Sequence, residues 1–313
     1  MKNIPIASNP GAWKSQPPLE IARSHPSVAT YNGKIYAFGG GGPSFKSLNS
    51  TICFDPQTTA WTPCQDMPTL RSGTVAATVG DKIYVMGGGF RQEDGMFRFL
   101  TTVEIYHPDS DSWEKGPDLL MPHDYPAVAK LGNSIYVIGG HHPDATQGGP
   151  KTDPGFDFCE RLDLEKGTWE EIAPLPTPRF ALTAIARGNE ILAMGGVAFR
   201  PEGFNNFNVI ETYDPETNTW KSEPEFKLPW PAAGLGSATV NNQIYVFGGY
   251  SDEDIHNRTA RFDSSTSSWQ QVDSLPSPVC AMGVTTYDGS VYMVGGWADD
   301  GRTPIDVFYR YTP

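Results

Sequence analysis

The feature that most constrains this chain is a short apolar segment ending in two glycines, which recurs six times along the sequence. The copies are IYAFGG (35–40), IYVMGG (83–88), IYVIGG (135–140), ILAMGG (191–196), IYVFGG (244–249) and VYMVGG (291–296). Self-similarity at a regular period is typical of chains that build one structural unit many times. The sequence therefore predicts six copies of one unit.

A tryptophan accompanies each copy: the six are Trp13, Trp61, Trp113, Trp169, Trp220 and Trp269. From each tryptophan to the first glycine of the next pair the interval is 26 residues in five cases and 28 after Trp220. From the glycine pair to the aromatic residue or Leu that ends the next strand, however, the interval varies from 14 to 23 residues. The constant intervals predict rigid strands, and the variable interval predicts a loop whose length differs between units.

Each unit accommodates four β-strands, here called a to d in chain order. Strand a is a run of small apolar residues such as GTVAATV (73–79), and strand b ends in the glycine pair. Strand b is almost continuously apolar, which predicts burial on both faces, and its glycines allow neighbouring backbones to approach closely. Strand c ends in the aromatic residue or Leu, and strand d carries the tryptophan. Six such units arranged radially make an all-β fold, the six-bladed β-propeller.

The two ends of the chain complete this arrangement. The last unit has strands a, b and c but no d, whereas Trp13 lies in a d-like segment before the first unit. We therefore expect residues 11–17 to form the outer strand of blade six and to close the ring, which removes exposed sheet edges. The whole chain, 1–313, is then one propeller, with blades at 20–65, 66–117, 118–173, 174–224, 225–273 and 274–313.

These motifs resemble those of the kelch-repeat family. The resemblance is carried by the double glycines, the spaced tyrosines and tryptophans, and the segment DMPTLRSG (66–73), which matches the pattern MPxxRxG. It covers nearly the whole chain. The resemblance implies a stand-alone propeller whose ligands meet the residues just after the glycine pairs and at the start of strand a.

Composition narrows the classes of partner. With a net charge of −13 the surface repels phosphate groups, so we expect neither nucleic acid nor an anionic membrane as a partner. The four cysteines show no metal-ligand or redox-motif spacing, and the sequence has no apolar leader and no apolar run of membrane length. We therefore expect a cytoplasmic monomer that uses no cofactor.

Variable loops gather on one face of the predicted propeller, because the b–c loops and d–a links lie on the same side. A rigid scaffold with variable loops on one face is a usual setting for binding. Arginines and histidines concentrate there, which suggests a small anionic or polyhydroxylated ligand, or an acidic peptide. The candidate ligand-binding residues are Arg23, His25, Arg71, Arg91, His141, His142, Arg179, Arg200, Tyr250 and Trp297.

Two alternatives stay open at this face. Arg23, Arg71 and Arg179 occupy a position that often carries Arg in kelch repeats, where they could instead brace neighbouring blades. In the third unit the segment His123-Asp124-Tyr125 replaces that Arg with groups suited to acid–base catalysis. The alternative function is therefore a cofactor-independent enzyme, such as a sugar mutarotase, an epimerase, another isomerase or a cyclase.

The longest b–c loop, at 141–158, begins with two histidines. With the aspartates of the loop they could hold a metal ion, but adjacent residues on an extended strand point to opposite sides, so we expect no metal. We expect the loop to form a partial lid over the mouth of the propeller. In that arrangement His141 or His142 reaches inward, and the Gly-Gly-Pro segment at 148–150 is mobile.

Overall fold

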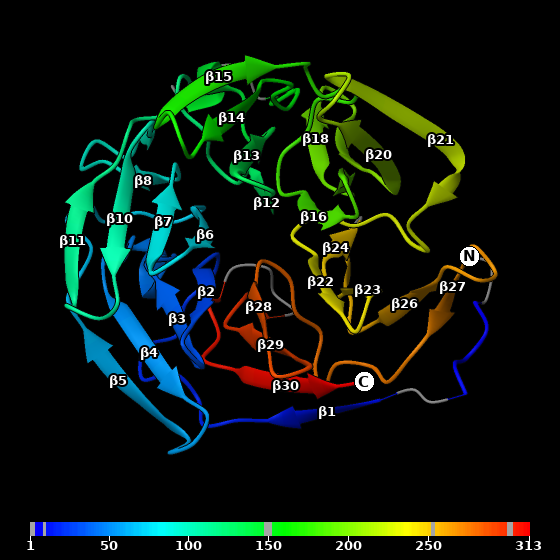
Figure 1. Ribbon diagram of the computed structural model, residues 1–313, viewed down its shortest axis with the longest axis horizontal. Helices are drawn as coiled ribbons and strands as arrows, with labels where there is room; N and C mark the ends of the chain where they lie inside the picture. Colours follow the sequence, from blue (N-terminus) through cyan, green and yellow to red (C-terminus); the bar gives the residue numbers. More distant parts are fainter. Residues whose placement is uncertain (1–3, 9–10, 147–151, 252–253, 299–302) are drawn as a thin grey trace.

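The structure is a computed structural model that describes residues 4–8, 11–146, 152–251, 254–298 and 303–313. These residues form six four-stranded antiparallel sheets arranged radially round a central channel (Figure 1). The predicted six-bladed propeller is thereby confirmed. In every blade the first strand lies nearest the channel and the fourth lies at the rim (Figure 1).

The strands follow the predicted units. Blade one holds β2 (Ser27–Tyr31), β3 (Lys34–Phe38), β4 (Thr51–Asp55) and β5 (Ala60–Cys64), and blade two holds β6 (Val75–Val79), β7 (Lys82–Met86), β10 (Val103–His107) and β11 (Ser112–Lys115). Blade three holds β12 (Ala127–Leu131), β13 (Ser134–Ile138), β14 (Cys159–Asp163) and β15 (Thr168–Ile172), and blade four holds β16 (Thr183–Arg187), β17 (Glu190–Met194), β20 (Val209–Asp214) and β21 (Thr219–Lys227). Blade five holds β22 (Gly236–Val240), β23 (Gln243–Phe247), β26 (Thr259–Asp263) and β27 (Ser268–Gln271), and blade six holds β28 (Gly283–Tyr287), β29 (Ser290–Val294), β30 (Phe308–Thr312) and β1 (Ala12–Ser15).

Two details differ from the expected blades. Strand β21 ends at Lys227, beyond the limit of 224 set for blade four. The b–c loops also contain short structure that the spacing did not predict. It comprises the hairpins β8 (Gly89–Arg91)–β9 (Phe97–Phe99), β18 (Val197–Arg200)–β19 (Gly203–Asn206) and β24 (Tyr250–Ser251)–β25 (Asp254–Ile255), and the single turns η1 (Pro43–Phe45) and η2 (Pro143–Thr146).

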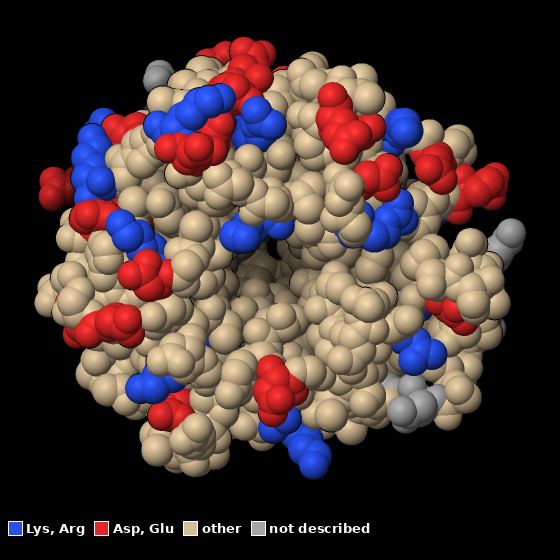
Figure 2. Space-filling view, viewed as in Figure 1, with Lys and Arg blue, Asp and Glu red and all other residues tan. Residues whose placement is uncertain are grey.

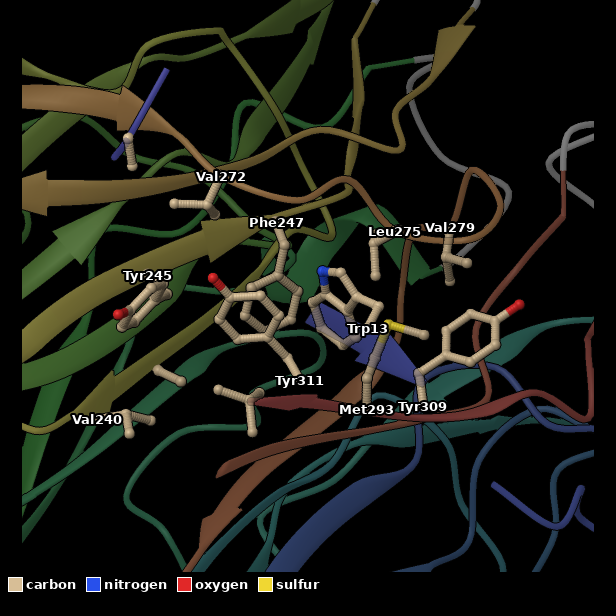
Figure 3. Packing of buried hydrophobic residues seen from close by; sticks show 13 residues of the cluster. Trp13, Val240, Tyr245, Phe247, Val272, Leu275, Val279, Met293, Tyr309 and Tyr311 are labelled. Atoms are coloured by element: carbon tan, nitrogen blue, oxygen red, sulfur yellow. The ribbon is translucent and has the colours of Figure 1, made fainter. Parts of the chain in front are cut away.

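The N-terminal segment closes the ring. Strand β1 pairs antiparallel with β30 and places Trp13 opposite Tyr311, which confirms the predicted closing strand (Figure 1). The segment also reaches the next blade, because the N–H of Gln271 in β27 donates to Pro5 O at 2.7 Å, and the N–H of Ala7 donates to Gln271 O at 2.8 Å. In Figure 3 the indole of Trp13 lies among apolar side chains of blades five and six.

The tryptophans of the outer strands fasten each blade to the one before it. Every one of the six indole N–H groups donates to a backbone carbonyl in the link that leaves the preceding blade, at 2.8–3.1 Å. The acceptors, from Trp13 onward, are Asp273, Pro17, Gln65, Pro117, Ala173 and Lys227. The repeated tryptophan therefore joins neighbouring blades by a hydrogen bond as well as by packing.

Charge is distributed rather than concentrated on the face shown in Figure 2. Acidic and basic side chains lie mostly toward the rim of that face, and a hollow opens at its centre. No helix in the described part of the chain is long and apolar enough to cross a membrane.

Candidate functional site

Six residues at the entrance to the inner strands form a closed belt round the channel, here called the mouth ring. They are His25, Gly73, Tyr125, Ala181, Gly234 and Ala281, and all have left-handed backbone conformation with φ between 50° and 66°. Five of their N–H groups donate to the carbonyl of the ring residue in the preceding blade, at 2.7–3.0 Å. Left-handed backbone is strained in residues other than glycine, and here the hydrogen bonds of the ring hold it in place.

Inside the mouth ring, the inner strands enclose a cavity of about 210 Å³. Hydroxyl pairs link neighbouring inner strands at this level. The Thr74 hydroxyl donates to Ser27 Oγ at 2.9 Å, and Thr183 Oγ1 lies 2.6 Å from Ser237 Oγ. The walls of the cavity therefore carry small side chains whose hydroxyl groups largely bond one another. The larger polar and aromatic groups lie at the entrance of the cavity.

A row of rings, here called the aromatic arch, crosses that entrance. The ring centroids of Trp297 and His25 are 4.6 Å apart, and those of His25 and Tyr125 are 4.3 Å apart. The Tyr125 and His141 centroids are 5.2 Å apart, and His141 stacks on Phe180 with centroids 3.8 Å apart. Blades six, one, three and four each contribute to this arch. A ring system of this kind offers flat apolar surface beside polar atoms.

Tyr250 extends the lining to blade five. Its backbone pairs with Ala233 in both directions at 2.9 Å. Its side chain packs against the small cluster formed by Phe180, Val197 and Ala233. Three of the ten candidate ligand-binding residues, His25, His141 and Trp297, thus lie in the arch, and Tyr250 lies beside it.

Gly73 provides the space in which the arch spans blade two. A Cβ atom at this position would lie 2.4 Å from Asp124 Oδ1 and 3.1 Å from the Tyr125 ring. With no side chain at Gly73, the Tyr125 ring reaches His25 over the intervening blade. The carboxyl group of Asp124 lies close to Gly73 as well.

Asp124 and His25 each carry a buried polar atom that has no hydrogen-bond partner among the described residues. These atoms are Asp124 Oδ1 and His25 Nδ1, and Asp124 is only 3% exposed. Burial, with the nearby charge of Asp153, raises the pKa of Asp124 well above its usual value. Burial, with His141, lowers the pKa of His25 to about 3. An unpaired buried polar atom costs about 1–3 kcal/mol. Both atoms are closed off from solvent, so a ligand would reach them only after a local side-chain movement at the mouth.

Replacing Asp124 by Asn tests this burial. Because the folded-state pKa is raised, the carboxyl contributes full stability only below its unfolded pKa, and that contribution is lost as the pH rises through the folded value. We therefore expect Asp124→Asn to raise the melting temperature at pH 8 relative to the native protein, with a smaller gain at pH 4. The exposed Glu93→Gln serves as the control, and equal shifts at both pH values for Asp124→Asn would contradict the assignment.

The three arginines expected at the mouth lie inside the blades. Arg23, Arg71 and Arg179 are at most 1% exposed. Each guanidinium donates to the carbonyl of the first glycine of its own blade's pair, at 3.0, 3.0 and 2.6 Å respectively. In blades two and four the guanidinium also forms a buried ion pair, Arg71–Glu104 at 2.9 Å and Arg179–Glu211 at 2.6 Å. These contacts brace each arginine's own blade rather than joining neighbouring blades, and they leave the three groups inaccessible to a ligand at the mouth.

His123 takes the same bracing position in blade three. Its Nδ1 lies 2.6 Å from Gly139 O and its Nε2 lies 3.1 Å from Glu160 Oε1, with the imidazole fully buried. The predicted catalytic trio is therefore not brought together. His123 lies within the blade, Asp124 is buried beside Gly73, and Tyr125 is part of the arch.

The remaining candidates lie on the loops. Arg91 and Arg200 are exposed on the hairpins of blades two and four, and Arg91 Nε donates to Gly95 O at 3.1 Å. The imidazole of His142 is 36% exposed and packs edge-on against Phe156. None of these three side chains has a ring contact with the arch among the contacts of the described residues.

The long insert of blade three docks onto its neighbours at both ends. Turn η2 contacts β9 of blade two. Asp153 exchanges two backbone hydrogen bonds with Phe199 of blade four, both at 2.7 Å. His141 reaches the mouth, as one form of the lid prediction expects, and its Nδ1 bonds the carboxylate of Asp153. The Gly-Gly-Pro segment at 148–150 lies outside the described residues.

Sequence reasoning missed several residues of this region, and only some left a signal. In blades two, three and four the brace is paired with a Glu of strand c, namely Glu104 with Arg71, Glu160 with His123 and Glu211 with Arg179. That correlation can be seen in the sequence. In blade five, where Ala232 stands at the brace position, the longer link supplies Trp230, whose indole N–H donates to Gly248 O at 3.4 Å. The roles of Asp153 and Phe180 left no comparable signal.

Comparison with known proteins gives three results. A family model described as the KLHDC2/KLHL20/DRC7 Kelch-repeats domain matches residues 11–196 and again residues 125–312. Kelch-like protein 36 of Bos taurus is 29% identical over 269 residues, which are 83% of this chain and 41% of that protein. Kelch-like protein terF of Aspergillus terreus is 28% identical over 252 residues, which are 76% of this chain and 52% of that protein.

A solved structure supports the same fold. The structure of YjhT matches with a TM-score of 0.78 at 16% identity, and the match covers 95% of this chain and 97% of that one. At this identity the likeness concerns the fold alone. The chain spans about half or less of the length of the curated relatives that match it, which is 33%, 41% and 52% in three cases.

Proposed function

Since this chain belongs to the kelch-repeat family, we propose that it is a binding propeller whose mouth holds a small polyhydroxylated ligand. The observation that carries the proposal is the pair of unsatisfied buried atoms, Asp124 Oδ1 and His25 Nδ1, one next to Tyr125 in the chain and the other on a ring that packs against Tyr125. A hydroxylated ligand can both donate and accept hydrogen bonds, so one molecule could satisfy both atoms. The rings of the arch would cover its apolar faces.

An anionic ligand is less well supported at this place. The arginines that favoured it are enclosed within the blades, and the carboxyl groups of Asp124 and Asp153 lie at the mouth instead. A ligand carboxylate or phosphate would lie beside like charge or beside a group that must stay protonated. The arginines of the hairpins, Arg91 and Arg200, remain available only on the loops outside the arch.

The binding prediction can be tested with a panel of neutral sugars and polyols and their acidic counterparts. We expect a neutral member to bind, as measured by calorimetry. Asp124→Asn or Trp297→Ala should then weaken its affinity by about 10-fold or more, since each lost hydrogen bond or ring contact contributes roughly 1–3 kcal/mol. Phe204→Ala, on an exposed hairpin ring, is the matched control. Unchanged affinity in both mouth variants would refute the proposal.

The enzyme alternative is favoured by one observation, the hydrogen bond between His141 and Asp153 at the mouth. A carboxylate that bonds one imidazole nitrogen orients the ring and leaves the other nitrogen to move protons, which is the arrangement of a general base. Burial alone would raise the pKa of Asp153, but its hydrogen bond with His141 holds that pKa below its usual value. If a bound ligand is also converted, His141→Gln should abolish turnover while binding persists. A substitution of the buried His123, by contrast, should affect turnover only by lowering the stability of the fold.

A further inference from the structure

Two cysteines of blade one lie side by side on adjacent outer strands. In the register of β4 and β5, Cys53 lies opposite Thr62 and Cys64 lies opposite Thr51. The two cysteines are therefore diagonal neighbours on one face of the antiparallel pair. Both pack into the cluster between blades one and two, where Cys53 is 7% exposed and Cys64 is more accessible.

The two thiols interact through a side-chain hydrogen bond that shifts the pKa of both. The bond from Cys53 lowers the pKa of Cys64 to about 7, and the same bond raises the pKa of Cys53. Tyr106 also lies beside Cys64, but its hydroxyl donates its single proton to Asp111 Oδ1 at 2.6 Å. The Cys64 thiol also donates to Thr62 O at 3.9 Å when it is protonated. Cys64 is therefore the thiol that ionises more readily, and the thiolate is the nucleophilic form of a cysteine.

We propose that Cys53 and Cys64 form an oxidisable thiol pair, which a peroxide converts into an intramolecular disulfide. The Cys64 thiolate attacks the peroxide, its sulfur takes one oxygen as sulfenic acid, and the O–O bond breaks to release hydroxide, which is protonated to water. The Cys53 sulfur then attacks the Cys64 sulfur. The S–S bond forms as the S–O bond breaks, and the departing oxygen leaves as water with the Cys53 proton. Two thiols lose two electrons in all, and one peroxide is reduced to two waters.

The geometry makes this disulfide reducible. Diagonal neighbours on an antiparallel pair have Cα atoms about 7–8 Å apart. An unstrained disulfide spans at most about 6.8 Å between Cα atoms, so β4 and β5 must draw together to form the bond. Strained disulfides have more oxidising potentials and are the labile ones. We therefore expect a mild dithiol to reverse the reaction.

The other two cysteines provide internal controls. Cys159 and Cys280 are at most 1% exposed, and burial raises the pKa of each to about 12. They have neither the accessibility nor the thiolate character that peroxide requires. Reaction should therefore be confined to the pair in blade one.

The test is intact-mass and peptide mass spectrometry on the full chain treated with hydrogen peroxide. We expect a loss of about 2 Da, a cross-linked peptide joining Cys53 to Cys64, and full recovery with dithiothreitol. Oxidation of Cys64 to sulfinic acid, a gain of about 32 Da, with Cys53 still alkylatable would overturn the proposal. An unreacted Cys64, or cross-links only between two chains, would also overturn it.

Variants separate the two roles. In Cys53→Ser the reaction should stop at Cys64 sulfenic acid, which dimedone traps, and in Cys64→Ser neither step should occur. Cys280→Ser should behave as the native protein does. Equal peroxide reactivity of Cys64→Ser and the native chain would contradict the assignment. The result on the native protein stands even if a variant folds poorly.

Discussion

Replacing Trp13 by Ala should lower the free energy of unfolding by about 3–5 kcal/mol, the usual cost of removing a buried tryptophan. The indole is 8% exposed and packs on Phe247, Tyr309 and Tyr311, with centroids 5.4, 6.5 and 5.0 Å away. Its N–H also bonds Asp273 O at 3.1 Å, which joins blades five and six. The loss should be measurable by denaturant titration of the whole propeller as one transition.

Deleting residues 1–17 should cost more than the single substitution, because it removes the pairing with β30 and the bonds to Gln271 as well. Lys14→Ala is the matched control, since Lys14 is exposed on the same strand. A truncated chain as stable as the full chain would contradict the closing role of this segment. So would a Trp13→Ala variant that unfolds no earlier than Lys14→Ala.

Replacing Arg179 by Ala should destabilise the protein by about 3–5 kcal/mol, since it leaves a carboxylate buried without its partner. Glu211 is 1% exposed, and apart from Arg179 it accepts a hydrogen bond from Thr177 Oγ1 at 2.7 Å. The loss of the three guanidinium bonds to the Thr177, Ala193 and Gly195 carbonyls adds to the effect.

Blade five supplies a natural template for the double variant, because Ala232 stands at the brace position and Ala260 at the position of the acid. We therefore expect the double variant Arg179→Ala/Glu211→Ala to lose less unfolding free energy than the two single variants lose together. A double-mutant cycle measures this difference. The exposed Arg200→Ala on the adjacent hairpin is the control. Strict additivity of the two single effects would show that the pair does not act as a unit.

Sequence spacing predicted the architecture well, for a physical reason. The glycine pairs and tryptophans act at every blade, so one structural requirement is repeated six times and becomes visible within a single chain. Closure could be predicted because the unpaired segment at each end completes the other. The hairpins in the b–c loops could not, since all three begin directly after the glycine pair but differ in length and in turn sequence.

The sequence predicted where the site lies but not which side chains form it. The positions after the glycine pairs and at the entrance to strand a do form the mouth, but the sequence could not show which way each side chain points. His25 and Tyr125 both have left-handed backbone, and their rings meet at the mouth, where His25 also borders the channel cavity. Arg23, two residues before His25, instead points into the blade. Whether a side chain points to the channel or into the blade depends on buried hydrogen-bond acceptors that distant strands contribute.

The measurement that tests the central claim most directly is a crystal structure of the protein with the tightest-binding member of the polyol and sugar panel. The proposal predicts ligand oxygens within hydrogen-bond distance of Asp124 Oδ1 and His25 Nδ1, with one face of the ligand against the aromatic arch. A competing cavity of about 500 Å³ lies between the β8–β9 hairpin and Pro143, lined by Phe97, Arg98 and Phe99. A ligand bound there, with both mouth atoms still unsatisfied, would contradict the account.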